Sequence, residues 1–392
     1  MKKNVLLTAP CLTTSGYGVH SRQIAKYLLS RHKKGDINLF IKTVPWGNTP
    51  WLLDSDNDNG FIGEIMRLTT DINVKPDVTI QNILPNEWKP IGKTNIGITA
   101  GIETTICNPD WISHVNSMSH VIVPSKFTKN VFTETSKRFN KNIETQIDVV
   151  YESYNEHITK TNDKLDFKID TSFNFLVFGQ ITARSVTADR KNTFNTIKWL
   201  CDEFKDDSDV GIIIKTNSGR QSLIDKLVTS SIINKLLKEI RKSQFPKVHL
   251  LHGPMSDKHV AMLYKEQSIK GLISATRGEG FGLPILEAAT SGLPVIVTSW
   301  SGHLDFMELG KYIKLDYELR DVTNQRIDNK LFIKGSQWAE VKESDFKKKV
   351  RKFKENSKLP KEWAAELSKK LIEKFSFDSV SKQYDEVLNK YL

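Results

Sequence analysis

The sequence is poor in cysteine and has no long apolar run. Its three cysteines, Cys11, Cys107 and Cys201, lie far apart without a Cys-x-x-Cys pair, so neither a zinc knuckle nor a disulfide framework is supported. Free thiols in a reducing cytosol are the simple interpretation, and we expect a cytoplasmic protein. Since no stretch of about 18 apolar residues occurs, no membrane span is expected. The opening MKKNVLLTAPCL lacks a small-residue cleavage site, which favours a first β-strand over a signal peptide.

The chain is long and basic. Its 392 residues exceed the usual size of a single core, which predicts two domains. The formal net charge of +11 favours anionic partners such as nucleic acid, acidic lipid surfaces or phosphorylated substrates. The densest basic run, FKKKVRKFKENSK at 346–358, is more simply a solvated helix face.

Short apolar runs alternate with helical patterns along the whole chain, which indicates βαβ units. A polar stretch at 155–172 is the best linker candidate, and a helical pattern closes the chain at 377–392. The pattern therefore predicts an α/β protein with two doubly wound domains facing a cleft. We expect an N-terminal acceptor-side domain at 1–160, a donor domain at 161–375, and a closing helix at 376–392 that packs back on the N-terminal domain.

Two weaker motifs leave alternatives open. The SGYG segment at 15–18 follows a strand and precedes a helix, so it is either a tight turn or a phosphate-contacting loop. Ser21 stands where the dinucleotide fingerprint needs a third glycine, and no Walker lysine follows. The DSDNDNG segment fails as a calcium loop because Asn59 and Ile65 stand where glycine and a carboxylate are required.

The strongest motif is TRGEGFGLPILEAATSGLPVIVTS, at 276–299. Glu279 and Glu287 are separated by seven residues. Gly280 and Gly282 permit close approach of the backbone to a ligand, and Pro284 suits the first turn of a helix. The N–H groups of that first turn are suited to bind an anion.

Spacing and composition here match the E-x7-E motif of retaining glycosyltransferases with the GT-B fold, of the family-4 type. Flanking segments extend the match: HLLHGPMSDKHVAMLY upstream, WSGHLDFM downstream, FNFLVFGQ with DRKNTF at the start of the donor domain, and SGYG in the N-domain. The resemblance covers most of the chain, except 43–75 and 310–360. The first of these segments also resembles glycosyltransferases encoded by large tailed phages. The implied fold is GT-B, with two Rossmann-like domains.

The resemblance implies a donor site for a nucleotide-sugar. Glu287 would bind the ribose hydroxyls and Glu279 the hydroxyls of the sugar. Cations would neutralise the leaving diphosphate, where negative charge grows in the transition state, so no metal or other cofactor is required. The remaining donor-binding residues are the backbone of Gly280, Phe281, Gly282 and Leu283, the side chains of Gln180, Arg184, Arg190, Lys191 and Lys215, and, from the N-domain, Gly16.

Glu279, Lys191 and Glu103 are the predicted catalytic residues, with Glu103 placed near the acceptor by the resemblance. The family pattern differs here in two respects. Arginine is common where Gln180 stands, and the N-domain segment TAGIETT lacks the histidine found in many relatives. His20 and His303 are possible substitutes, although a lone histidine is more often structural. Retaining members of this fold usually lack a clear protein nucleophile, which implies attack from the face that the diphosphate leaves.

The acceptor is read from the less typical N-domain. Trp46, Trp51 and Trp88 lie in loop-like segments where they would stack on a sugar ring or an extruded base, or simply pack, and His20 is a further acceptor candidate. The basic charge and the phage likeness favour a hydroxymethylated base in DNA as the acceptor. A saccharide, lipid or lipopolysaccharide is the alternative, with peripheral membrane contact left open. UDP-sugars are the favoured donors, for a hexosyl- or pentosyltransferase.

Two other functions are alternatives. A nucleotide-sugar epimerase shares the two-domain fold and would release an epimerised sugar without an acceptor. A non-catalytic nucleic-acid-binding protein would bind DNA with a steep salt dependence and ignore sugar nucleotides. The intact donor motif argues against the second of these.

Overall fold

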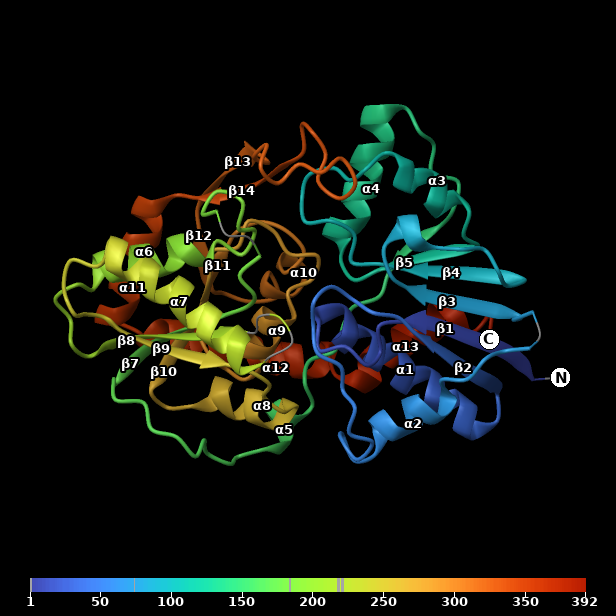
Figure 1. Cartoon of the computed structure of the whole chain (residues 1–392), viewed down its shortest axis with the longest axis horizontal. Coiled ribbons are helices and arrows are strands. Elements are labelled where there is room, and N and C mark those ends of the chain that lie inside the picture. Colours follow the sequence, from blue (N-terminus) through green and yellow to red (C-terminus); the bar gives the residue numbers. More distant parts are fainter. Residues whose placement is uncertain (1, 74, 183–184, 217–218, 220–221) are drawn as a thin grey trace. The chain divides into compact units, whose positions relative to one another are not determined.

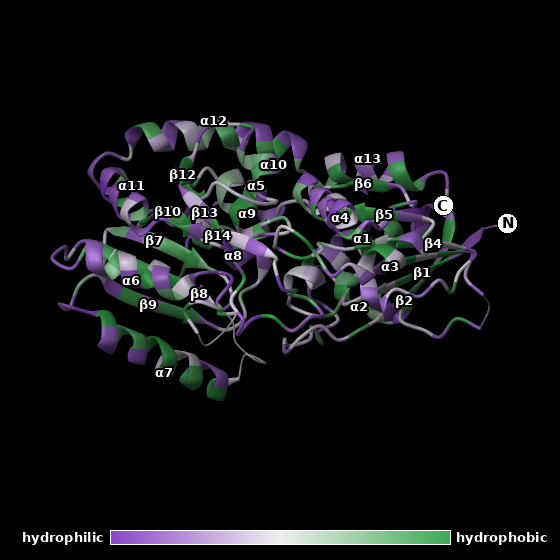
Figure 2. Cartoon of the chain, turned by 90° about the horizontal axis from the view of Figure 1, so that it is seen from above, coloured by the Kyte–Doolittle hydropathy of each residue, from purple (hydrophilic) through white to green (hydrophobic). Residues whose placement is uncertain are grey.

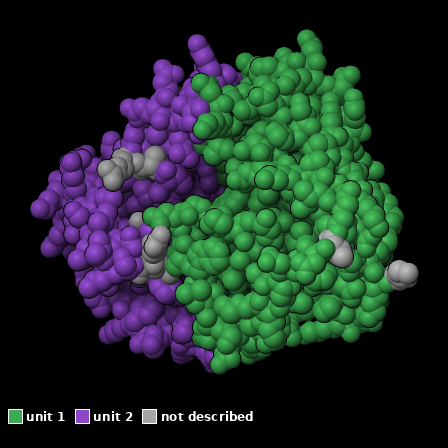
Figure 3. Space-filling view, turned by 45° about the vertical axis from the view of Figure 1, so that its right-hand side comes forward, with its two compact units in different colours: residues 1–153, 329–333, 377–392 green, residues 154–328, 334–376 purple. Residues whose placement is uncertain are grey.

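A computed structural model describes the chain except for residues 1, 74, 183–184, 217–218 and 220–221. The described residues form two compact units, coloured green and purple in Figure 3. Unit 1 contains Met1–Ser153, Asn329–Ile333 and Phe377–Leu392, and unit 2 contains Tyr154–Asp328 and Lys334–Ser376. The polar stretch at 155–172 opens unit 2 and contains only one short helix, α5 (His157–Lys160).

Unit 1 is built on a parallel sheet of six strands, in the order β2-β1-β3-β4-β5-β6 (Figure 1). All five strand pairs are parallel. Its strands are β1 (Lys3–Ala9), β2 (Ile37–Thr43), β3 (Val78–Asn82), β4 (Thr94–Ile98), β5 (His120–Val123) and β6 (Ile147–Val149). Since the chain adds β2 on one side of β1 and β3 on the other, the order reverses between β1 and β3.

The helices of unit 1 include one from the end of the sequence. α1 (Gly16–Lys34) begins where Ser15 Oγ accepts from the N–H of Gly18, and it ends at Gly35, whose φ of 85° suits glycine. The last helix, α13 (Phe377–Leu388), places Val380, Tyr384, Val387 and Leu388 in the core of unit 1. The other helices are α2 (Phe61–Leu68), the 3₁₀ turn η1 (Pro85–Glu87), α3 (Asp110–Asn116) and α4 (Lys126–Phe139).

Unit 2 has a second parallel sheet of six strands, in the order β12-β11-β10-β7-β8-β9. Its strands are β7 (Phe173–Phe178), β8 (Val210–Thr216), β9 (Lys247–His252), β10 (Ile269–Ser274), β11 (Val295–Thr298) and β12 (Ile313–Leu315). The helices are α6 (Thr193–Glu203), α7 (Leu223–Ile240), α8 (Asp257–Lys265), α9 (Leu283–Thr290), α10 (Leu304–Met307), α11 (Glu343–Glu355) and α12 (Lys358–Lys374). The strands of both sheets are mainly hydrophobic in Figure 2, as expected where helices cover both faces.

An antiparallel hairpin stands apart from the main sheet of unit 2. Its strands are β13 (Tyr317–Asp321) and β14 (Gln337–Val341), and both lie within the segment that departs from the family pattern. The predicted doubly wound α/β architecture is confirmed by the two parallel sheets with interleaved helices. None of the described helices combines the length and hydropathy of a membrane span.

Candidate functional site

The strand order of unit 2 indicates where a ligand binds. The chain adds β8 and β9 on one side of β7, and then β10 and β11 on the other. Neighbouring loops at such a reversal diverge, which leaves a crevice beyond the carboxyl ends of the strands. The loop after β7 carries Arg190 and Lys191, and the loop after β10 carries Glu279. The topology therefore brings residues about 90 positions apart to one edge of the sheet.

Glu279 and Lys191 form a buried ion pair at this edge. Lys191 Nζ donates to both carboxylate oxygens of Glu279 at 2.7 Å, and Arg190 Nη1 lies 3.6 Å from Glu279 Oε2. Glu279 is 6% exposed. Burial alone would raise its pKa, but the charges of Lys191 and Arg190 hold the pKa at about 2. Glu279 is therefore ionised at neutral pH and accepts hydrogen bonds without acting as a proton carrier.

Glycines shape the loop between Glu279 and α9. Gly282 precedes the helix with a φ of 101°, and Pro284 occupies its first turn. Gly302 lies so close that a Cβ there would meet the carbonyl oxygen of Gly280 at 2.0 Å. The side chain of Phe281 packs inward against Phe306, with ring centroids 5.3 Å apart. Phe281 therefore anchors the loop through its side chain. Binding of the diphosphate by the backbone of 280–283 remains a prediction.

Glu287 belongs to a second cluster, one helical turn into α9. Tyr264 Oη donates to Glu287 Oε2 at 3.3 Å, and the Tyr264 ring stacks on Phe178 at 5.8 Å. Burial and the nearby charge of Asp257 raise the pKa of Glu287 to about 8. The two glutamates of the motif therefore have opposite electrostatics, because only Glu279 has cationic partners among the contacts that the structure describes.

The other predicted cations differ in their surroundings. Lys215 is 3% exposed, donates to the Gly253 carbonyl oxygen at 2.6 Å, and has its pKa lowered to about 8 by burial. Gln180 is exposed at the end of β7. Arg184 lies outside the described residues. Lys191 and Arg190 are consequently the predicted cations that the structure brings to Glu279.

Sequence reasoning gave no role to Arg277, the second residue of the motif. Its side chain is 2% exposed and contacts Glu340 through Nε at 2.6 Å and Nη2 at 2.9 Å. Its Nη1 donates to the Val186 and Asp189 carbonyl oxygens at 3.0 and 2.5 Å. In the structure, the burial of so polar a side chain indicates that Arg277 is important. In the sequence, the only such indication is an arginine at the position where the strand pattern ends.

Asp189 organises the loop that carries the cations. It is fully buried, and its Oδ1 accepts from the N–H and hydroxyl of Thr182 at 3.1 and 2.7 Å. Its Oδ2 accepts from the N–H of Thr193, the first residue of α6, at 2.7 Å. This carboxylate therefore caps α6 and fixes the turn immediately before Arg190 and Lys191.

His303 is structural in its contacts. It is fully buried, and its Nε2 lies 2.7 Å from the Thr298 carbonyl oxygen, to which it must donate. Burial lowers its pKa. Because Nε2 carries the proton and Nδ1 faces the Ser301 hydroxyl at 3.4 Å, His303 is committed to holding the loop after β11.

Within unit 1, aromatic residues gather at the carboxyl ends of the strands. Trp46 stacks on Tyr17 with centroids 4.0 Å apart, and Tyr17 Oη bonds to the Thr99 hydroxyl and the Ala100 N–H, both at 3.0 Å. Gly16 is exposed in the first turn of α1, with no atom within 4 Å of a Cβ placed there. A stacked and partly exposed aromatic pair thus adjoins this helix start.

The remaining predictions for unit 1 fall in different places. Trp51 is 38% exposed and forms an isolated β-bridge with Thr13. Glu103 is half-buried in the loop after β4, where its charge acts on Tyr17. His20 is 2% exposed and lies 3.0 Å from Tyr384 Oη of α13. Burial also lowers its pKa to about 3, so His20 is a neutral core residue at physiological pH.

The basic run of α11 is largely neutralised by neighbouring acids. Of its cations, several are engaged within unit 2, as expected of a solvated helix face rather than a nucleic-acid surface. The pairs are Lys347 with Asp202 and Glu343, Lys349 with Asp316 and Asp345, Arg351 with Glu203, and Lys354 with Asp207.

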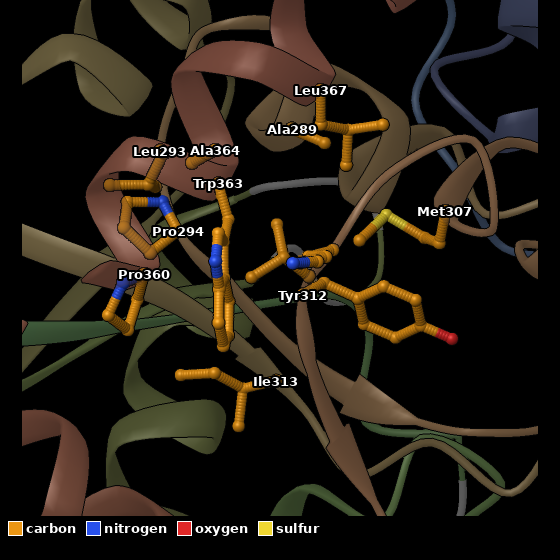
Figure 4. Close-up of a pocket in the computed structure, with 12 residues that line it drawn as sticks. Ala289, Leu293, Pro294, Met307, Tyr312, Ile313, Pro360, Trp363, Ala364 and Leu367 are labelled. Carbon is orange, nitrogen blue, oxygen red and sulfur yellow. The ribbon is translucent and has the colours of Figure 1, made fainter.

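An apolar pocket lies at the other end of the unit 2 strands. It is lined by Trp363 of α12, by Pro294 and Ile313 at the amino ends of β11 and β12, and by Met307 and Tyr312 (Figure 4). Few polar groups converge there, so it lacks the chemistry of a catalytic site. Across the described ranges, no group of three His, Cys, Asp or Glu side chains is placed to hold a metal ion.

A family model matches part of the chain. Residues 234–370, which include both motif glutamates, match the model of glycosyl transferases group 1. The chain is a glycosyltransferase. Comparison with curated protein sequences finds no significant match.

Solved structures of similar fold cover the length of this chain. A glycosyltransferase from Rickettsia africae is 14% identical, with a TM-score of 0.65 over 100% of this chain and 98% of that chain. The α,α-trehalose 6-phosphate synthase from Burkholderia multivorans is 7% identical, with a TM-score of 0.64 over 100% and 99%. Sucrose-phosphate synthase from Thermosynechococcus elongatus is 11% identical, with a TM-score of 0.60 over 99% of each chain. At these identities the likeness shows the GT-B fold alone.

Proposed function

We propose that the enzyme moves a sugar from a nucleoside diphosphate sugar, with UDP-sugars favoured, to a hydroxyl acceptor with retention of anomeric configuration. The observation that carries the proposal is the cluster of buried Glu279 with the partly buried Lys191 and Arg190 at the strand reversal of unit 2. A cation pair beside an ionised acid suits a ligand with a diphosphate next to a polyhydroxylated ring.

Each member of the cluster has a distinct role in this proposal. Lys191 and Arg190 stabilise the negative charge that grows on the diphosphate as the bond to the sugar breaks. Glu279, held ionised by them, accepts hydrogen bonds from sugar hydroxyls and fixes the anomeric carbon relative to the leaving group. With a pKa of about 2, Glu279 is a poor general base, so the proton of the acceptor hydroxyl passes to a leaving phosphate oxygen.

The acceptor side of the proposal rests on unit 1. The Trp46–Tyr17 stack and the half-buried Glu103 supply an aromatic face and an acid, which suit a sugar ring or a flipped base carrying a hydroxyl. The net charge of +11 supports a hydroxymethylated base in DNA. The ion pairs of α11 reduce the support that its basic run gives to a DNA acceptor, so saccharide and lipid-linked acceptors are tested beside DNA.

The test combines a donor panel with three acceptor classes. The enzyme is incubated with UDP- and GDP-sugars and with DNA containing 5-hydroxymethylcytosine, a set of saccharides or a set of lipid-linked saccharides, and the mass of each product is measured by mass spectrometry. We expect a gain of one sugar with one donor, lost in Glu279→Gln and kept in Glu308→Gln, whose carboxylate is half exposed in a surface ion pair. The anomeric proton coupling of the product checks retention. An enzyme that neither releases nucleoside diphosphate nor modifies any acceptor would overturn the proposal.

A further inference from the structure

Arg277 lies at the centre of the contacts between the two loops of the donor site. Its backbone N–H donates to the Arg190 carbonyl oxygen at 2.8 Å, while its guanidinium donates to the carbonyl oxygens of Val186 and Asp189. The residue thus spans the turn before Arg190 and Lys191 from one end to the other. Glu279 follows Arg277 by two residues. A single arginine therefore contacts the loop at 186–191, here called the cation loop, and begins the loop that carries Glu279.

The β13–β14 hairpin holds this arginine in place. Glu340 of β14 receives the guanidinium through two parallel hydrogen bonds, and the Ala339 N–H donates to the Arg277 carbonyl oxygen at 3.0 Å. Trp338, 1% exposed, lies with its ring 5.5 Å from the Arg277 guanidinium carbon. Consecutive residues of one strand therefore fix the side chain of Arg277 by charge, by backbone pairing and by an aromatic face.

Only arginine has the geometry for this arrangement. Its planar guanidinium donates to a carboxylate and to backbone carbonyl oxygens at the same time, whereas the ammonium group of lysine is a single point charge. The guanidinium of Arg277 is directed away from Glu279, since it donates to Glu340 and to the backbone of the loop at 186–189. Its effect on a bound ligand must therefore pass through the position of Lys191 and Arg190.

We propose that Arg277 and Glu340 act as a clamp that positions the cation loop against Glu279, and that the β13–β14 hairpin exists in this chain to brace the donor site. Arg277 is accordingly a positioning residue. The inference rests on the proposed function, because it assumes that Lys191 and Arg190 meet the diphosphate. Displacement of about 1 Å at a reacting centre can cost two orders of magnitude in rate, so the clamp bears on catalysis without touching the ligand.

Calorimetric titration with UDP alone and GDP alone tests the clamp. The variants are Arg277→Lys and the near-isosteric Glu340→Gln, and the matched control is Arg320→Lys in β13, whose arginine is 65% exposed in a surface pair with Glu318. We expect affinity for the preferred diphosphate to fall roughly tenfold in Arg277→Lys and less in Glu340→Gln. We expect no change in Arg320→Lys, because exposed pairs contribute little.

A double-mutant cycle separates positioning from general loss of structure. In a Lys191→Met background, Arg277→Lys should have a smaller effect on affinity, because one of the two cations that it positions is gone. Equal effects in both backgrounds, or unchanged affinity in Arg277→Lys and Glu340→Gln, would overturn the clamp. If Arg277→Lys fails to fold, the same cycle is run with Glu340→Gln. A wild-type enzyme that binds neither diphosphate would instead refute the proposed function, on which the clamp depends.

Discussion

Replacing Lys191 with methionine should destabilise unit 2 in a way that depends on pH. The change keeps the length of the side chain and removes the charge that lies 2.7 Å from a carboxylate whose side chain is 8% exposed. Loss of one partner from a buried pair costs about 3–5 kcal/mol, because the remaining charge is uncompensated. Arg190 stays 3.6 Å from Glu279, so we expect a loss of about 2–3 kcal/mol.

Calorimetry converts this loss into a shift of the unfolding temperature. For a unit of this size each kcal/mol lowers Tm by roughly 2–4 °C, so Lys191→Met should unfold about 4–12 °C earlier near pH 7. The control is Lys314→Met, which breaks a pair of the same 2.7 Å length between half-exposed side chains. That variant should lose at most about 1 kcal/mol, because solvent screens its charges.

The pH dependence distinguishes an electrostatic loss from a packing loss. In the wild type the pKa of Glu279 is depressed to about 2, so its pair stabilises the fold above about pH 4.5 and is lost as the pH falls toward 2. In Lys191→Met, burial without this cation raises that pKa, and the carboxyl takes up a proton at higher pH. The difference in Tm between the wild type and Lys191→Met should therefore become smaller as the pH falls from 7 to about 4. A difference that is constant over this range, or no larger than that of Lys314→Met, would refute the reasoning.

Three further predictions concern other parts of the enzyme. Because the pKa of Glu287 is raised to about 8, its ionisation destabilises the fold as the pH rises from about 4.5 to 8. Between about pH 6 and 8.5, the Tm of Glu287→Gln should therefore fall less than the Tm of the wild type. Parallel plots of Tm against pH for the two proteins would contradict this. Gly302→Ala should reduce the free energy of unfolding by at least ~1–3 kcal/mol and weaken diphosphate binding, because its Cβ would meet the Gly280 carbonyl oxygen at 2.0 Å. Unchanged stability and diphosphate affinity in calorimetry would refute it. Trp46→Ala should raise the acceptor KM about fivefold or more and leave diphosphate affinity unchanged, as read from steady-state kinetics and titration. Trp88 is 4% exposed, so Trp88→Ala should instead reduce the free energy of unfolding by the ~3–5 kcal/mol of a core truncation, as read from calorimetry.

Local signals in the sequence predicted the parts of the site that depend on neighbours along the chain. The run of glycines, the proline and the flanking apolar stretches placed Glu279 in a loop and Glu287 in a helix, as the structure has them. The alternation of strand and helix patterns predicted two doubly wound sheets. The order of the strands in each sheet could not be predicted from the sequence, because a periodic pattern indicates that a strand exists but not which strand it pairs with.

Long-range contacts account for what the sequence did not predict. The role of Arg277 depends on Glu340, 63 residues later, and the burial of His20 depends on Tyr384, 364 residues later. The opposite pKa shifts of Glu279 and Glu287 arise from Lys191, Arg190 and Asp257, which only the folded sheet brings near. The spacing of residues within one motif gives no information about such distant partners. The different pKa values of Glu279 and Glu287 could therefore not be predicted from the sequence.

The position of α13 has a consequence for the order in which the chain folds during synthesis. Unit 1 starts with the first strand of the protein but takes Val380, Tyr384 and Leu388 into its core. Its hydrophobic interior is therefore incomplete until these residues have left the ribosome, after all of unit 2 has been translated. A nascent chain that ends before 377 should hold unit 1 in a loosely packed state that depends on chaperones. A fragment containing only 1–153 should be poorly folded in isolation, which makes unit 2 the better choice for expression as a separate piece.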